Sequence, residues 1–223
     1  MSDDPVCRVC GGSSRHFYRG SRDFYRCIAC SLVFTEQTLP PDGQRQHYVS
    51  QWSAQKPGFW AEQADAVLVF ARRYREPTRI LDFGAGSGGL TEELRRRGFD
   101  CTSLEPLVNG RLADQSYHAP FDLVVGLEVI EHLPNLWEEL HEIDRRLVPG
   151  GVMLFTTMLT EGFIHAPNAA DTFQGWWYKD DPTHVSFFCH RTLQVLGTIG
   201  NYDLDVIGGG VIVVRKPGGE NRA

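Results

Sequence analysis

The sequence predicts an α/β protein with a mostly parallel sheet whose last strand is antiparallel, preceded by a small metal-binding module. Three observations support this prediction. Two Cys-x-x-Cys pairs lie within the first 30 residues, apolar strand-like runs alternate with helical segments from residue 80 onward, and a glycine-rich turn follows the first of those runs. Alternating strands and helices are typical of a parallel sheet that binds its ligands at the carboxyl ends of the strands.

Composition limits the partners and the compartment that we expect. The chain has 223 residues and a formal net charge of −6, so it has no general attraction for phosphate backbones, and nucleic acid is the less expected partner. No apolar run is long enough to cross a bilayer. The first residues show neither the basic start nor the apolar stretch of a secretion signal. We therefore expect a cytoplasmic protein that does not enter a membrane.

Four of the six cysteines form a pattern typical of a zinc site. Cys7 and Cys10 make one pair, Cys27 and Cys30 the other, and a short hairpin is predicted between them at residues 17–26. Four thiolates satisfy tetrahedral zinc, and the expected compartment favours a metal over disulfides. The module resembles a zinc ribbon. Two redox or incidental pairs are the weaker alternative, because one redox pair would suffice.

This interpretation gives the zinc ribbon a structural role. A closed four-cysteine site leaves no open coordination position, and a module this small depends on the metal for its folding energy. Its arginines allow two interpretations: an RNA-reading face or, as we expect, a solvated surface packed on the next domain. These arginines are Arg8, Arg15, Arg19, Arg22 and Arg26.

The chain is predicted to divide into a module, a linker, a large domain and a tail. Residues 40–43, Pro-Pro-Asp-Gly, are typical of a turn, and no clear periodicity follows them. From Phe59 apolar residues recur every three or four positions, which predicts an amphipathic helix that stops before Pro77. The predicted boundaries are 1–36 for the zinc-ribbon module, 37–58 for the linker, 59–216 for the α/β domain and 217–223 for a disordered tail.

Strands and helices are expected to alternate through the α/β domain. Glu105 directly follows the second predicted strand, and Glu128 directly follows the third. Acidic side chains are thus expected at the edge of the sheet where ligands bind. We predict strands at 80–83, 101–104, 121–127 and 152–157, helices at 91–97, 137–147 and 192–199, and a closing hairpin at 204–207 and 211–214.

The glycine-rich turn is compatible with two kinds of nucleotide ligand. Gly84-x-Gly86-x-x-Gly89, followed about 20 residues later by Glu105, matches a dinucleotide fingerprint. Asp82 argues against a dinucleotide, because its carboxylate stands close to where pyrophosphate would meet the helix N-terminus. A cationic group suits this position better.

Longer stretches carry a more specific resemblance. Residues 81–88, Leu-Asp-Phe-Gly-Ala-Gly-Ser-Gly, look like motif I of class I S-adenosylmethionine-dependent methyltransferases. Residues 121–133 resemble that family's fourth strand and the loop after it, and residues 147–151 resemble the turn before its fifth strand. The closing hairpin is similar to its antiparallel seventh strand. These marks appear in family order within residues 59–216, and a zinc ribbon is fused to this fold in some sugar C-methyltransferases and ribosomal RNA methyltransferases.

The resemblance implies a Rossmann-like methyltransferase fold that binds S-adenosylmethionine. Asp82 would attract the methionine ammonium, and Glu105 would accept hydrogen bonds from the ribose hydroxyls. Glu128 would lie beside the methionine and the sulfonium. N-capping by Asp82 and a surface position for Glu105 are the alternatives. The cofactor-binding residues so implied are Asp82, Gly84, Ala85, Gly86, Gly88, Glu105, Pro106, Leu127 and Glu128.

One segment departs from the family pattern. After Glu105 the family usually has a helix and a third strand, with an acid that contacts adenine, but residues 106–120 are too few for both elements. We expect the helix to be missing or reduced to a turn, with Asp114 or Gln115 as alternatives for the adenine contact. The shortened edge is a candidate docking place for the zinc ribbon or for another subunit, which leaves a homodimer open.

The long segment at residues 160–188 is the expected acceptor side, because it follows a strand's carboxyl end and is rich in aromatic residues. Methyl transfer needs an aligned nucleophile and often a base, and the imidazole of His184 is the first candidate. A structural histidine that pins the loop is the alternative. Further candidates are His132, Tyr178 and His165 as bases, Asp181 as a group that orients an imidazole, and Trp176 and Trp177 as pocket walls or core.

Three functions are compatible with these patterns. We expect a methyltransferase that moves the methyl group of S-adenosylmethionine to an oxygen, nitrogen or carbon of a small metabolite or natural product. The same chemistry on RNA, with the zinc ribbon as reader, is one alternative. A non-catalytic zinc-ribbon binding protein on a methyltransferase scaffold is the other.

Overall fold

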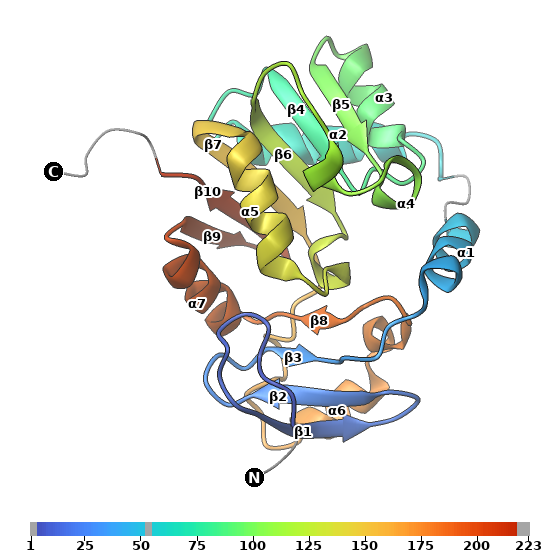
Figure 1. Ribbon diagram of the computed structural model, residues 1–223, viewed down its shortest axis with the longest axis vertical. Coiled ribbons are helices and arrows are strands. Elements are labelled where there is room, and N and C mark those ends of the chain that lie inside the picture. Colours follow the sequence, from blue (N-terminus) through green and yellow to red (C-terminus); the bar gives the residue numbers. More distant parts are fainter. Residues whose placement is uncertain (1–3, 52–54, 218–223) are drawn as a thin grey trace, which may run out of the picture.

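A six-stranded sheet forms the centre of the protein (Figure 1). The structure is a computed structural model, and it describes residues 4–51 and 55–217. The strand order is β5-β4-β6-β7-β10-β9. The strands are β4 (Arg79–Phe83), β5 (Asp100–Leu104), β6 (Phe121–Leu127), β7 (Leu147–Thr156), β9 (Asp203–Ile207) and β10 (Val211–Arg215).

Strand pairing within this sheet agrees with the sequence prediction. β5, β4, β6 and β7 are parallel, whereas β10 runs antiparallel to both β7 and β9. The mostly parallel sheet with an antiparallel last strand is therefore confirmed. Because the parallel strands end at one edge, the residues that follow Phe83, Leu104 and Leu127 come together there.

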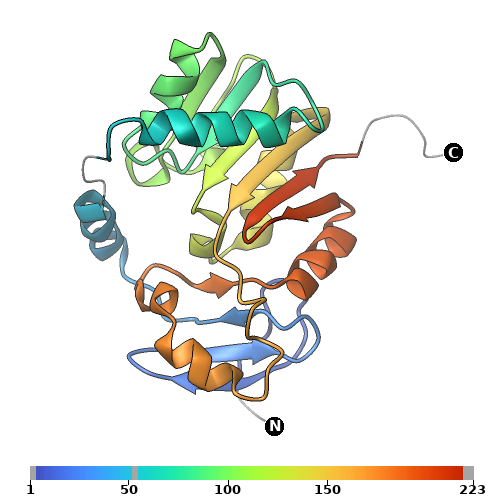
Figure 2. The ribbon, with the colours of Figure 1, turned by 180° about the vertical axis from the view of Figure 1, so that it is seen from behind.

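Helices cover both faces of the sheet. Ile80 belongs to the apolar cluster under α2 and α3, and its neighbour Leu81 belongs to the cluster under α5 and α7. Successive strand residues point to opposite faces, so a strand covered on both sides is apolar throughout. Figure 2 shows α2 lying across the sheet on the face away from α5. The bounds are α2 (Phe59–Ala71), α3 (Gly89–Arg96), α5 (Leu136–Arg146) and α7 (His190–Gly200).

The N-terminal module completes a second sheet with a segment far along the chain. The order of this sheet is β1-β2-β3-β8, and it lies on the side to which the parallel strands point (Figures 1 and 2). β3 pairs with β8 in antiparallel fashion, and the N–H of Thr35 donates to the carbonyl of Val185 at 3.1 Å. The strands are β1 (Ser14–Arg19), β2 (Asp23–Cys27), β3 (Val33–Phe34) and β8 (Ser186–Phe187).

Arg22 fastens the module to residues 179–184. Its guanidinium donates to four backbone carbonyls of that segment at 2.6 to 3.2 Å. Phe24 packs against Phe187 of β8 and against Phe173 of α6 (Ala169–Gly175). The module thus packs on the α/β domain, as expected. The expectation that it docks at the shortened edge beside β5 is wrong, because its own β3 edge is paired with β8.

Two connecting segments test the sequence predictions, and only one of the two predictions is correct. The linker at 37–58, expected to be irregular, contains α1 (Pro41–Gln51), because Pro41 and Asp42 suit the first turn of a helix as well as they suit a loop. After Glu105 the chain forms only the short α4 (Pro106–Asn109) and a 3-10 turn (Leu112–Asp114), so the predicted reduction to a turn is confirmed. The predicted tail lies almost wholly outside the described residues.

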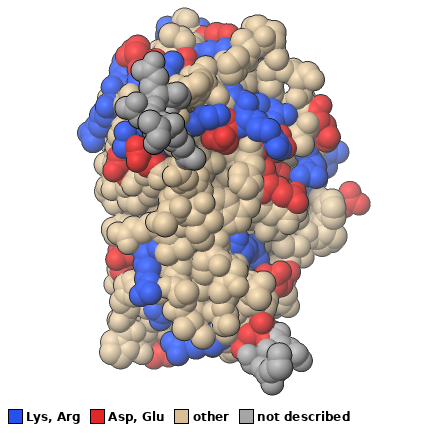
Figure 3. All heavy atoms as spheres, turned by 60° about the vertical axis from the view of Figure 1, so that its left-hand side comes forward, with Lys and Arg blue, Asp and Glu red and all other residues tan. Residues whose placement is uncertain are grey.

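The surface carries no field of a single sign on the face seen in Figure 3, where acidic and basic side chains are interspersed. None of the helices in residues 4–51 and 55–217 has the length and apolar character that crossing a bilayer requires.

Candidate active site

A cavity of about 370 Å³ lies at the carboxyl ends of β4, β5 and β6. Residues 83–87, 105–107, 127–129 and 132–133 contribute to its wall, each group at the end of one of these strands. Trp60 of α2 and Tyr48 of α1 complete the enclosure. The cavity therefore occupies the position at which parallel sheets bind ligands.

The glycine-rich turn approaches the cavity closely because its residues carry no side chain there. Gly84 and Gly86 have φ of 73° and 52°, in the left-handed region that favours glycine. A Cβ on Gly84 would stand 2.5 Å from Cγ2 of Val129. The N–H groups of Gly84 and Ala85 both donate to the carbonyl of Leu104, at 2.8 and 3.2 Å, which fixes the turn to the end of β5. Gly84, Ala85 and Gly86 all line the cavity.

Glu105 lies beside this turn, half-buried in the cavity wall. Its carboxylate accepts hydrogen bonds from the N–H groups of Gly86 at 3.0 Å and Leu107 at 3.1 Å. A carboxylate has about four lone-pair positions, so both oxygens keep acceptor capacity toward a ligand. Pro106, which follows, is also part of the wall.

Asp82 and Gly88 do not line the cavity. Asp82 is buried, and its carboxylate accepts a hydrogen bond from Oγ1 of Thr91 at 2.7 Å, in the first turn of α3. Burial raises the pKa of Asp82 to about 6. Gly88, with a φ of 83°, is the residue from which α3 starts. The structure therefore places both residues behind the turn, where they fix the start of α3, and Asp82 corresponds to the capping alternative.

Glu128 faces the cavity from the end of β6 in an uncommon backbone conformation. Its φ is 53°, in the left-handed region. Its carboxylate accepts hydrogen bonds from Oγ1 of Thr156 at 2.9 Å and from the hydroxyl of Tyr178 at 2.8 Å. These two contacts hold the carboxylate at the cavity next to Leu127.

His132 is the imidazole of the cavity wall. Its Nδ1 lies 2.7 Å from the hydroxyl of Tyr48 and 3.2 Å from the carbonyl of Thr183. Burial, together with the neighbouring His184, lowers the pKa of His132 to about 3. The ring is therefore neutral at physiological pH, with one nitrogen lone pair available.

His184, the first candidate base, is buried behind His132 and does not line the cavity. Its Nδ1 lies 2.7 Å from the carbonyl of Tyr178, and its ring centroid lies 4.5 Å from that of His132. Burial lowers the pKa of His184. The segment after β7 therefore folds back so that His184 packs behind the cavity wall. His132, rather than His184, is the histidine that lines the cavity.

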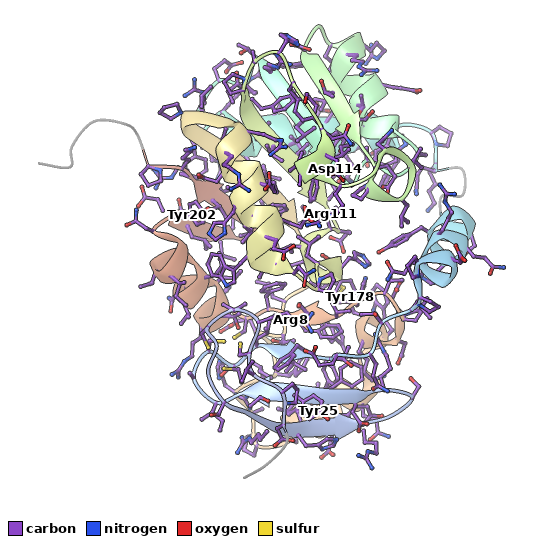
Figure 4. The ribbon with its side chains drawn as sticks, in the orientation of Figure 1. Arg8, Tyr25, Arg111, Asp114, Tyr178 and Tyr202 are labelled. Atoms are coloured by element: carbon purple, nitrogen blue, oxygen red, sulfur yellow. The ribbon has the colours of Figure 1, made fainter. Side chains whose placement is uncertain are left out.

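Tyr178 belongs to a buried acidic network between the two sheets (Figure 4). Its hydroxyl contacts carboxylate oxygens of Glu128 and Glu131, and it lies 3.1 Å from Oγ1 of Thr157. Burial and the nearby Glu128 raise the pKa of Glu131 to about 8. Burial and the same two carboxylates also raise the pKa of Tyr178, so its phenol stays protonated and donates.

The remaining acceptor-side candidates lie away from the cavity. Trp177 is 67% exposed, and Trp176 packs in the aromatic cluster around Phe173. His165 is exposed, and Asp181 accepts from Nε2 of His47 at 3.0 Å. Asp114 and Gln115 do not reach the cavity either.

Sequence reasoning missed several wall residues, of which the aromatic side chains of Tyr48 and Trp60 are the largest. Tyr48 lies in a stretch without periodicity, so the sequence contained no signal for its position. Trp60 lies in the predicted amphipathic helix, and its indole covers Gly89, where a Cβ would lie 2.1 Å from Nε1. A bulky residue opposite an obligatory glycine is the signal that could have placed Trp60 at the turn.

The four ribbon cysteines converge on one point. The Sγ atoms of Cys7 and Cys30 are 3.5 Å apart, those of Cys10 and Cys27 are 3.4 Å apart, and all four lie within 4.8 Å of one another. These separations are too long for disulfides, whose sulfurs lie about 2.05 Å apart. Tetrahedral zinc with bonds of about 2.3 Å sets its sulfurs roughly 3.8 Å apart, so the donor set fits zinc. The yellow sulfur atoms in Figure 4 gather where the loops of the module face α7.

Comparison with known proteins identifies the domain around the cavity. The family described as "Methyltransferase domain" matches residues 52–206. The chain belongs to this family. The expected class I methyltransferase domain behind a four-cysteine module is therefore confirmed.

Curated relatives resemble this methyltransferase over part of their length. Malonyl-[acyl-carrier protein] O-methyltransferase of Enterobacter lignolyticus is 29% identical over 147 residues, which cover 57% of this chain and 55% of that protein. Ubiquinone biosynthesis O-methyltransferase of Paramagnetospirillum magneticum is 29% identical over 126 residues, which cover 47% of this chain and 51% of that protein. The methyltransferase thus spans about half the length of these relatives.

Solved structures share the fold of this methyltransferase. The plantazolicin methyltransferase BpumL, solved in complex with a pentazolic desmethylPZN analog and SAH (S-adenosylhomocysteine), matches with a TM-score of 0.54 at 13% identity, over 78% of this chain and 91% of that one. DesVI of Streptomyces venezuelae matches with a TM-score of 0.54 at 15% identity, over 79% of this chain and 97% of that one. At these identities the likeness establishes the fold.

Proposed function

We propose that this protein transfers the methyl group of S-adenosylmethionine to a small-molecule acceptor, with an oxygen as the preferred methylated atom. The cavity carries this proposal: a glycine turn and Glu105 form one side, and Glu128 and His132 form the other. The curated relatives are named O-methyltransferases, which supports the reaction. The structural neighbour was solved with SAH, which supports S-adenosylmethionine as the donor.

The residues of the cavity fit the methyl donor. S-adenosylmethionine contains a ribose diol, which a carboxylate with free acceptor positions such as Glu105 can bind. Its ammonium and sulfonium are cationic, and Glu128 supplies a negative charge on that side of the cavity. Gly84 and Gly86 bring backbone without side chains to the cavity wall, so a ligand can lie against it. Asp82 acts behind the turn by fixing α3, rather than by touching the donor.

The acceptor side centres on His132. In the transfer, the acceptor oxygen forms a bond to the methyl carbon, the bond from that carbon to sulfur breaks, and the electron pair stays on sulfur to give S-adenosylhomocysteine. The hydroxyl proton of the acceptor must leave, and the neutral ring of His132 is the cavity group placed to assist its removal. Tyr48 and Thr183 fix the orientation of that ring.

We also propose that the four ribbon cysteines hold one structural zinc ion. Their sulfurs already converge, and all four ligand positions are filled by protein, which leaves no position for a substrate. When bound, zinc would supply folding energy to the module and hence hold β3 against β8.

The two alternatives have less support. An RNA reader would present its arginines to solvent. Arg15 and Arg19 are exposed, but Arg22 is bound to four carbonyls, and Arg8 donates to the carbonyl of Thr35 and pairs with Glu36. A non-catalytic scaffold would not need a cavity formed by glycines with positive φ and two carboxylates.

Calorimetry with S-adenosylmethionine tests the proposal. We expect the wild-type protein to bind the donor and Glu105→Ala to bind at least tenfold more weakly, because the variant loses its contact with the ribose diol. Asp114→Ala, which alters an acid outside the cavity, is the matched control and should bind like wild type. Failure of the wild type to bind the donor would refute the enzymatic function. A screen of hydroxylated metabolites for release of S-adenosylhomocysteine would then identify the acceptor.

A further inference from the structure

A Glu–His–His cluster lies in the wall between the cavity and the ribbon sheet. Glu131, His132 and His184 each offer one ligand atom, and these atoms lie within 4.8 Å of one another. Glu131 and His132 are consecutive in a 3-10 turn (Ile130–His132), and the N–H of Val185 donates to the carbonyl of Glu131 at 2.9 Å, which brings His184 beside them. Of the three, His132 reaches the cavity.

Glu131 has an unpartnered oxygen in this cluster. The residue is 0% exposed, and Oε1 contacts the hydroxyl of Tyr178, whereas Oε2 has no hydrogen-bond partner among the described residues. A buried polar atom without a partner costs about 1–3 kcal/mol. Since native proteins rarely tolerate that cost without a reason, the free oxygen points to a ligand that the side chain awaits.

Both histidines direct a lone pair away from their backbone contacts. A carbonyl oxygen only accepts, so Nδ1 of His184 must donate its N–H to Tyr178, which leaves Nε2 unprotonated. Nδ1 of His132 lies 3.2 Å from the carbonyl of Thr183 and 2.7 Å from the hydroxyl of Tyr48, and donation of its N–H to these two oxygens leaves Nε2 unprotonated. An imidazole whose second nitrogen donates to a carbonyl is the usual arrangement of a metal-binding histidine.

We propose that Glu131, His132 and His184 bind one divalent first-row transition metal ion, which holds a hydroxyl-bearing acceptor at the methyl donor. The proposal rests on the methyltransferase function proposed above and specifies how its acceptor side works. Two imidazoles and one carboxylate favour manganese, iron, cobalt or zinc over magnesium. Metal bonds of about 2.1 Å require ligand atoms roughly 3–4 Å apart, so a small side-chain movement closes the site.

The ion would act as a Lewis acid toward the acceptor. Three protein ligands leave coordination positions open on the side of His132, which suits an acceptor with two adjacent oxygen atoms. Coordination lowers the pKa of the hydroxyl, and its proton leaves to solvent. The oxygen then forms its bond to the methyl carbon while the sulfur–methyl bond breaks and sulfur keeps the electron pair. His132 assists by holding the ion, rather than by taking the proton.

A second cluster lacks the features that support this one. Glu161, His165 and Cys189 also lie within 4.8 Å of one another. His165 is exposed, and the carboxylate of Glu161 accepts the N–H of His190 at 2.9 Å and lies 3.7 Å from its ring. This cluster contains no unpartnered buried oxygen among the described residues, so it provides the control.

Cobalt binding tests the proposal on the full-length protein with its ribbon zinc in place. We expect Co²⁺ to bind with a stoichiometry of one per chain, and to give a visible spectrum without the thiolate charge-transfer band that a cysteine site would show. Glu131→Gln and His132→Asn should each weaken Co²⁺ binding at least tenfold, since metal ligands act together. Glu161→Gln should bind Co²⁺ like wild type.

Separate measurements distinguish failure of this site from failure of the enzyme. Calorimetry measures the binding of S-adenosylmethionine to the donor site in the same samples, and donor binding shows that each variant is folded. Donor binding without stoichiometric Co²⁺ binding in the wild type would overturn the metal site and leave the methyltransferase function standing. Co²⁺ binding that is undiminished in both Glu131→Gln and His132→Asn would overturn the site as well.

Discussion

At the scale of single residues, the cavity depends on side chains that hold its wall residues in place. Asp82 is buried against α3 and fixes the helix that begins behind the turn. Val129 fills the space next to Gly84, so the glycine has no room for a Cβ. Tyr48 and Thr183 set the ring of His132. Contacts within the wall and directly behind it therefore define the shape of the site.

Gly84→Ala is expected to damage both folding and donor binding. Its φ of 73° disfavours alanine, and the new Cβ would lie 2.5 Å from Cγ2 of Val129. We expect a loss of about 1–3 kcal/mol in the free energy of unfolding, measured in urea, and donor affinity at least tenfold weaker by calorimetry. Gly162→Ala, where a Cβ meets nothing within 4 Å, should change stability by less than about 0.5 kcal/mol. Equal effects of the two substitutions would contradict this account of the turn.

Asp82→Asn should alter the pH dependence of stability. Burial raises the pKa of Asp82 from 3.8 to about 6, so the folded protein retains a proton that the unfolded chain has lost between these values. The resulting stabilisation is complete below pH 3.8 and is lost as the pH rises through 6. A shift of about two units corresponds to at most about 3 kcal/mol.

Urea unfolding of both proteins across this range measures the effect. The free energy of unfolding of the wild type should fall relative to that of Asp82→Asn between pH 4 and pH 7. A constant difference between the two proteins would show that the carboxyl does not titrate as proposed.

At the scale of elements, the acceptor-side segment is held from outside the α/β domain. β8 is paired with β3 of the zinc ribbon, and Arg22 of the ribbon binds four carbonyls of residues 179–184. His184, which supports His132, lies at the end of this stretch. The position of the cavity wall is therefore coupled to the N-terminal module.

Arg22→Ala is expected to loosen that coupling. Removing a charged donor shared by four buried or half-buried carbonyls should cost about 2–4 kcal/mol of unfolding free energy and increase amide hydrogen exchange in residues 179–187. Arg19→Ala is the control, because Arg19 is exposed and pairs only with Asp23; its cost should stay below about 1 kcal/mol. Similar exchange in both variants would mean that Arg22 does not hold the segment.

Sequence patterns predicted the elements with clear periodicity and failed where pairing partners lie far apart. The apolar runs of β4 and β6 were sufficient to predict strands, because a strand buried on both faces is apolar throughout. The spacing in α2 was sufficient to predict a helix, because a helix buried along one stripe repeats its apolar residues every three or four positions. The β3–β8 pair leaves none, since each strand is two residues long and its partner lies about 150 residues away. α1 was missed because Pro and Asp start helices as readily as they form turns.

The candidate site likewise contains residues that the sequence could predict and residues that it could not. Gly84, Glu105 and Glu128 could be predicted, because they directly follow strands and the sheet brings those ends together. The sequence could not predict that His132 lines the cavity and His184 lies behind it, because this depends on how residues 160–188 fold back. No local pattern in that segment distinguishes a side chain on the wall from one behind it.

At the scale of the whole molecule, the four-cysteine module is part of one structure with the methyltransferase domain. Its buried cysteines belong to the same apolar cluster as Leu193 of α7, and the side chain of Trp137 in α5 donates to the carbonyl of Val9 at 2.9 Å. Loss of the metal should therefore weaken more than the module.

Cys27→Ser tests this coupling. We expect the variant to carry one zinc ion per chain fewer than wild type by metal analysis, and to unfold at a lower temperature in a single transition that includes the α/β domain. Cys101→Ala, which changes a buried cysteine of β5 outside the cluster, should keep its zinc content. A lower melting temperature of the ribbon alone, with the domain unaffected, would show that the two parts are independent.

The β3–β8 pair also has a consequence for the order of folding. A chain emerging from the ribosome presents the cysteines first, but β8 is not synthesised until residue 187. The ribbon sheet must therefore wait with an open edge while the central sheet forms, and its closure is a late, long-range step. Refolding experiments should accordingly show the four cysteines protected from thiol reagents only after the parallel strands have assembled, although the cysteines are the part of the chain made first.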